Sequence, residues 1–165
     1  MVAVLPALVA GPILGKGNIS SMEVFKDFFG PLPGYLKEDS VFPIAGITDL
    51  AEIHYRALES KEANGRRLIS NNYNLTTKNI FKLLEDNFAK DGYKVNNREV
   101  TTEEMEKAAQ NKSFGVRFSL VSRGAGAHFD DQTTEKVLGL KFEKPEKSII
   151  DGVRSLIKFG ILTKN

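Results

Sequence analysis

The sequence predicts an α/β fold, in which strands of a parallel sheet alternate with covering helices. Three observations support this prediction. The chain opens with an almost unbroken apolar run, residues 2–12, which is typical of a strand buried on both faces of a parallel sheet. Residues 41–88 then follow a strand, helix, strand, helix order. The chain closes with an amphipathic helix over residues 145–158.

The first forty residues are predicted to hold one strand and a long excursion. The strand is expected over about Val2–Leu5, because the proline that follows has no N–H, with Ala7–Ala10 continuing at its carboxyl end. Ligands of open α/β sheets bind beyond the carboxyl ends of the strands, so Pro6–Pro12 is where a ligand is expected first. Residues 15–40 are rich in glycine and proline around a short helix candidate, Met22–Phe29, and are expected to lie outside the core.

The middle of the chain alternates between strands and amphipathic helices. Val41–Ile47 is a predicted strand, and Thr48 is expected to cap the helix after it. The inward positions of this helix follow three- and four-residue spacing: Leu50, Ile53, His54, Ala57 and Leu58. Arg66–Ser70 is a second predicted strand, followed by a helix that begins at Thr76 or Thr77. Its inward positions are Ile80, Phe81, Leu84 and Phe88.

Two further helices are predicted in the last third of the chain. Thr101 and Glu104 match the capping-box pattern, which starts a short charged helix that reaches about Gln110 and is expected to face solvent. Pro145 begins the last helix and Gly160 ends it. Its buried face is expected to consist of Ile149, Ile150, Val153, Leu156 and Ile157.

Composition excludes several classes of protein. The 165 residues are 41% hydrophobic and 27% charged, as in ordinary globular domains, and the net charge of +2 does not indicate nucleic-acid or membrane binding. The opening run lacks the basic residues of a signal peptide and is shorter than a membrane span. The absence of cysteine excludes a disulfide scaffold and a cysteine nucleophile, and favours a cytoplasmic location.

Most motifs of nucleotide and metal chemistry are absent. Gly11–Lys16 differs from a P-loop, because three residues rather than four separate its glycines and Gly17 stands where Ser or Thr is needed. The only two histidines, His54 and His128, are far apart and lack a spaced carboxylate partner, so no metal ligand is assigned. His54 is interpreted as a structural histidine, whereas His128 lies in a glycine-rich segment suited to ligand contact.

Five short blocks, taken in order, resemble the carboxyl-terminal half of an extended short-chain dehydrogenase/reductase. The branch they resemble is the dihydroflavonol reductase-like group, which includes fungal methylglyoxal and aldehyde (ketone) reductases. The blocks are Pro6–Pro12, Gly46–His54, Gly65–Ile69, Leu138–Phe142 and the terminal helix. The resemblance implies the carboxyl-terminal part of a Rossmann-type NAD(P)-binding fold plus its mixed α/β substrate-binding lobe. It implies a single piece over residues 1–165, with the amino-terminal dinucleotide-binding half absent.

The resemblance implies no catalytic residue in this chain. Enzymes of the family bind NADP(H) on an amino-terminal Rossmann half and reduce a carbonyl with a Tyr-x-x-x-Lys pair and a serine. The chain has four tyrosines, and none has a lysine four residues later: Tyr35, Tyr55, Tyr73 and Tyr93 are followed at that spacing by Asp39, Glu59, Thr77 and Asn97. A catalytic tyrosine needs a nearby cation to lower its pKa.

What the resemblance does carry over is a set of cofactor contacts. Pro6, Ala7, Leu8 and Val9 match the segment that lies along the nicotinamide and its ribose, and Ser21 falls near the serine that faces the cofactor phosphates. The family usually has Asn or a small polar residue before this proline, and this chain has Leu5 there.

Two functions therefore compete at the level of sequence. In the first, the chain is the substrate-lobe portion of an NADP(H)-dependent aldehyde or ketone reductase, inactive by itself. Its partners are a small carbonyl substrate and either a missing amino-terminal half or a second copy, with no nucleic acid and no membrane. In the second, the chain is a non-catalytic binding or interaction protein derived from that lobe. A third interpretation is an unrelated small α/β domain.

Overall fold

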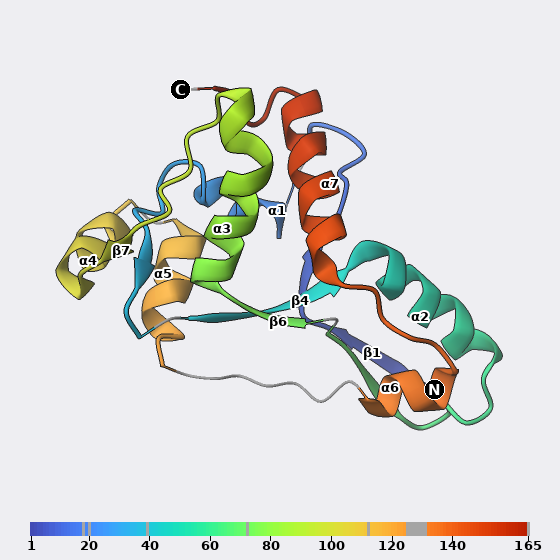
Figure 1. Cartoon of the computed structure of the whole chain (residues 1–165). Helices are drawn as coiled ribbons and strands as arrows, with labels where there is room; N and C mark the ends of the chain where they lie inside the picture. Colours follow the sequence, from blue (N-terminus) through green and yellow to red (C-terminus); the bar gives the residue numbers. More distant parts are fainter. Residues whose placement is uncertain are drawn as a thin grey trace.

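The computed structural model describes residues 1–164 apart from Asn18, Ser20, Asp39, Asn72, Lys112 and residues 125–131. Within these residues, short strands and longer helices form the predicted α/β fold (Figure 1). His128, the histidine of the glycine-rich segment, lies outside the described residues.

The strands form three small sheets. They are β1 (Ala3–Pro6), β2 (Leu8–Ala10), β3 (Tyr35–Leu36), β4 (Val41–Gly46), β5 (Arg67–Ser70), β6 (Tyr73–Thr76) and β7 (Glu99–Val100). β1 pairs in parallel with β5, and β3 pairs in parallel with β7. β4 lies between β2, to which it is parallel, and β6, to which it is antiparallel. The chain passes from the first sheet to the second at Ala7, so the opening run contributes one strand to each sheet.

The helices fall into groups that pack on different sheets. They are α1 (Met22–Asp27), α2 (Ile47–Glu59), α3 (Thr77–Phe88), α4 (Thr102–Ala109), α5 (Phe114–Val121), α6 (Gln132–Leu138) and α7 (Pro145–Lys158), with a 3-10 turn over Ala89–Asp91. In Figure 1, α3 and α7 lie side by side on one side of β4 and β6, whereas α2 and α6 lie around β1. The predicted terminal helix is confirmed, with Ile149, Val153 and Leu156 fully buried.

Two of the predicted threonine caps are confirmed and one is wrong. The Thr76 hydroxyl accepts the N–H of Asn79 at the start of α3. Thr101 and Glu104 form both hydrogen bonds of a capping box at the start of α4. Thr48, however, does not cap α2, because β4 runs through Gly46 directly into a helix that begins at Ile47.

The larger hydrophobic cluster lies between the second sheet and the helices α1, α3, α4, α5 and α7. Its centre is aromatic: the Phe28 ring lies 4.7 Å from that of Phe81 and 6.1 Å from that of Phe42, centroid to centroid. The prediction that residues 15–40 lie outside the core is wrong, because Phe25, Phe28 and Leu32 are fully buried. The glycines and prolines there end a helix whose aromatic side chains fill the core.

A smaller cluster joins the first sheet to α2 and α6. Its buried members are Ile53, Ala57, Ala63, Leu68 and Leu138. Two predicted inward positions of α2 are wrong, because His54 and Leu58 are exposed and Leu58 retains 85% of its surface. A two-stranded sheet is narrow, so only one stripe of α2 finds a surface to cover. The His54 ring still bonds locally, since Nδ1 lies 2.7 Å from the carbonyl oxygen of Leu50.

The opening strand is not buried on both faces as predicted. Ala3, Leu5 and Pro6 of β1 are exposed, and Val4 is half-buried. The helices of the described chain cover only one face of the β1–β5 pair, so the apolar residues of the other face remain open. The short helix α4 is also less solvent-facing than predicted, because Met105 is completely buried in the larger cluster.

Candidate functional site

The segment predicted to contact a cofactor links the two sheets. Pro6 lies opposite Ser70 in the parallel pair of β1 and β5, and the Ala7 N–H donates to the Ser70 carbonyl over 2.9 Å. Leu8 then pairs with Ile44 in the second sheet. Pro6–Val9 therefore begins at the carboxyl ends of two parallel strands, the edge where α/β folds bind ligands.

The accessibility of this segment leaves room for contact with a ligand. Pro6 is exposed, Ala7, Leu8 and Val9 are half-buried, and Ala10 is completely buried. Apolar side chains held by two sheets present a surface that needs little rearrangement when a flat apolar ring packs on it. The backbone of this segment is fixed by β5 on one side and by β4 on the other.

The segment that follows β2 is anchored on α7. The Ile13 N–H donates to the Ser155 hydroxyl over 2.9 Å. A Cβ added to Gly152 would lie 2.9 Å from the carbonyl oxygen of Gly11 and 2.7 Å from Cε of Met22. The glycine in α7 thus lets the end of the opening run and the start of α1 contact the same point of the helix.

Ser21 lies at the N-terminal end of α1. Ser21 directly precedes Met22, whose side-chain Cε lies beside Gly152. The Ser21 hydroxyl makes no capping hydrogen bond with α1. Gly11, in the loop after Pro6–Val9, and Met22, the residue after Ser21, therefore both contact α7 at Gly152, and the Ser21 hydroxyl is not used by its own helix.

Ser70 is a residue of this region that sequence reasoning did not assign to a site. It is completely buried at the carboxyl end of β5, and nothing among the described residues hydrogen-bonds its hydroxyl. An unmet buried hydroxyl lowers the stability of the fold, which is characteristic of positions with a further role. The signal in the sequence is a serine as the last residue of a predicted strand, beside the strand that carries Pro6.

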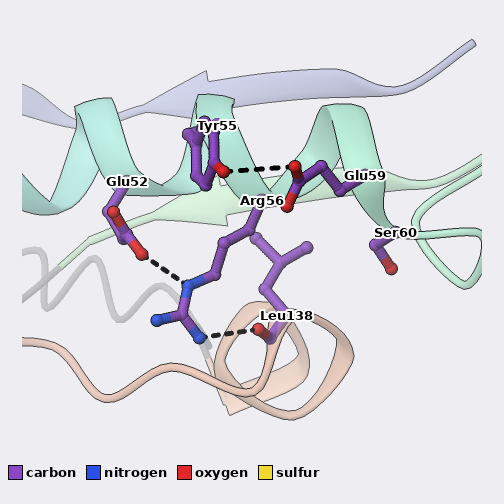
Figure 2. A pocket seen from close by; sticks show the side chains of 6 residues that line it. All are labelled: Glu52, Tyr55, Arg56, Glu59, Ser60 and Leu138. Atoms are coloured by element: carbon purple, nitrogen blue, oxygen red, sulfur yellow. Dashed lines mark hydrogen bonds and ion pairs between the residues drawn. The ribbon is translucent and has the colours of Figure 1, made fainter.

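A separate shallow pocket lies between α2 and α6. Its volume is about 450 Å³, and it is lined by Glu52, Tyr55, Arg56, Glu59, Ser60 and Leu138 (Figure 2). Arg56 donates to the Glu52 carboxylate over 2.6 Å and to the carbonyl of Leu138 over 3.2 Å. Tyr55 donates to Glu59 over 3.1 Å.

The polar side chains that line this pocket form hydrogen bonds with one another and with the end of α6. We therefore interpret the pocket as a structural contact between α2 and α6. Arg56 also donates to the Gly139 carbonyl over 2.6 Å, which satisfies the last carbonyls of α6. Ser60 accepts the N–H of Ala63 at the end of α2. The arginine thereby fixes α6 to α2.

Hydrogen bonds shift the pKa values of four charged side chains elsewhere in the described chain. Hydrogen bonds from Arg98 and from the Thr101 backbone lower the pKa of the Glu104 carboxyl, and the backbone N–H of Glu103 lowers the pKa of its own carboxyl. Hydrogen bonds to Asp86 and Asp151 raise the pKa values of Lys82 and Lys147. All four groups lie on exposed helix surfaces.

The described residues form neither a metal-ligand cluster nor a membrane-spanning helix. Across the described residues, no three His, Cys, Asp or Glu side chains gather as metal ligands would. None of the described helices is both long and apolar enough to cross a bilayer.

A cation–π contact lies elsewhere on the surface. The Lys78 ammonium lies over the face of the Tyr35 ring, 5.4 Å from the ring centroid.

Comparison with known proteins defines the fold. No family model and no curated protein matches the sequence. Yeast methylglyoxal/isovaleraldehyde reductase Gre2, solved with NADPH, matches with a TM-score of 0.66 and 21% identity over 96% of this chain and 47% of its own. Alfalfa vestitone reductase matches with a TM-score of 0.68 and 15% identity, over 98% of this chain and 45% of its own.

A third solved structure with a similar fold is not a reductase. A nucleoside-diphosphate-sugar epimerase from Pseudomonas aeruginosa matches with a TM-score of 0.67 and 15% identity, over 98% of this chain and 49% of its own. This chain therefore shares its fold with about half of each of these two reductases and this epimerase, which agrees with the α/β fold that the sequence blocks implied. This chain spans about half the length of the proteins that it matches.

Proposed function

We propose that this chain is the carboxyl-terminal, substrate-lobe portion of an NADP(H)-dependent reductase of aldehydes or ketones. The observation that supports the proposal is the extent of the structural match, which covers 96% of this chain but only 47% of the yeast reductase. That reductase acts on methylglyoxal and isovaleraldehyde and was solved with NADPH. Two of the three neighbours described above are reductases, so carbonyl reduction is the activity that this fold suggests first.

The residues present fit a role in holding the nicotinamide end of the cofactor. Pro6–Val9 would lie along the nicotinamide and its ribose, where the half-buried side chains of Ala7, Leu8 and Val9 exclude water. The Ser21 hydroxyl, which does not cap α1, would donate to a cofactor phosphate. When bound, NADPH supplies a hydride to the carbonyl carbon of the substrate.

The chain by itself is expected to be inactive. It has no Tyr-x-x-x-Lys pair to protonate the carbonyl oxygen and no glycine-rich cradle for the pyrophosphate. We regard residues 1–165 as one piece, in which the last strands of the Rossmann sheet interleave with the substrate-binding lobe. The absence of cysteine supports a cytoplasmic location for it.

The test is a reductase assay on the purified chain. NADPH and methylglyoxal are mixed with the chain, and NADPH consumption is followed by absorbance, with yeast Gre2 as the positive control. We expect a rate equal to that of the buffer blank. Turnover well above the blank would show that the chain is a complete enzyme and would overturn the proposal.

A second candidate is a non-catalytic binding protein derived from the same lobe. The larger hydrophobic cluster favours it, because it involves five helices and the second sheet and does not depend on β1 or β5. A lobe with its own core folds without the nucleotide-binding half. Sharp, reversible melting of a protein that does not bind NADPH, followed by calorimetry and NADPH fluorescence, would favour this second function.

A further inference from the structure

We draw no further inference here: the strongest candidate, the exposed apolar face of α2 formed by Ile47, Tyr55 and Leu58, carries none, because nothing in the described part of the structure shows what covers it.

Discussion

The carboxylate of Asp27 accepts the backbone N–H of Gly115 over 3.0 Å, between residues 88 positions apart in the sequence. The same oxygen, Oδ2, accepts the Ser113 hydroxyl over 2.6 Å, and Ser113 in turn accepts the N–H of Val116. A buried carboxylate of α1 thereby caps the first turn of α5. This arrangement fixes the two helices that cover one side of the larger cluster.

Asp27→Ala should destabilise the protein by about 2–3 kcal/mol, because it leaves two buried donors without an acceptor. Urea unfolding followed by circular dichroism measures the loss. Asp86→Ala, which removes an exposed ion pair with Lys82, is the control and should leave the midpoint nearly unchanged. Equal midpoints for the two variants would show that the α1–α5 contact contributes little.

Gly152→Ala should also destabilise the protein, by about 1–3 kcal/mol, although alanine is the better helix former. The added methyl group would meet the Gly11 carbonyl and the Met22 side chain. Arg154→Ala, at an exposed position of the same helix, is the control. A stabilised Gly152→Ala protein in thermal melts would mean that α1 and the Gly11 loop move apart at no cost.

Arg56→Met should loosen α6 without unfolding the lobe. The substitution keeps the apolar stem but removes the hydrogen bonds to the Leu138 and Gly139 carbonyls. Hydrogen exchange over α6 is expected to be about tenfold faster, while exchange over α3 is unchanged. Glu59→Gln, which changes the neighbouring side chain that accepts a hydrogen bond from Tyr55, is the matched control. Unchanged exchange in α6 would contradict the role given to Arg56.

The start of α4 should lose stability in acid. Hydrogen bonds from Arg98 and the Thr101 backbone lower the pKa of Glu104 in the folded protein from its ordinary value of 4.5. A lowered folded-state pKa stabilises the fold above the unfolded pKa, and this contribution is lost as the pH falls through the folded one. Amide exchange at Thr101 should therefore accelerate below about pH 4.5. Glu104→Gln should remove this pH dependence, and a pH dependence that persists would assign it elsewhere.

Local signals predicted the elements that depend on local chemistry. Thr76 and the pair of Thr101 and Glu104 cap helices where the sequence places them, because a cap involves residues two or three positions apart. The terminal helix was predicted from its apolar spacing and its proline start. The strand Arg66–Ser70 is confirmed as β5, within one residue.

Elements that depend on distant partners were missed. β3 and β7 are two residues each and exist only because Tyr35 and Glu99 lie side by side. β6 is only four residues long, too short for its apolar–polar alternation to predict a strand, and is defined by its pairing with β4. The helices α5 and α6 were not predicted either, and α5 starts where Asp27 of a distant helix supplies its cap.

The candidate site also combines a feature that the sequence predicted with one that only the structure shows. The position of Pro6–Val9 after a strand, and hence at a ligand-binding edge, was predicted from the sequence by itself, because proline and the apolar run are local features. Only the tertiary structure revealed that Gly152 holds the start of α1, next to Ser21, against the loop that follows this segment.

The sequence by itself thus determined the α/β class, the capped helices and the strand that leads to the candidate site. The tertiary structure decided which apolar surfaces are covered. Phe25 and Phe28, in a segment expected outside the core, are buried, whereas Leu5, in a strand expected to be buried on both faces, is exposed. Hydrophobicity is a property of a residue, but burial requires a partner surface, and for Leu5 no part of the described chain supplies one.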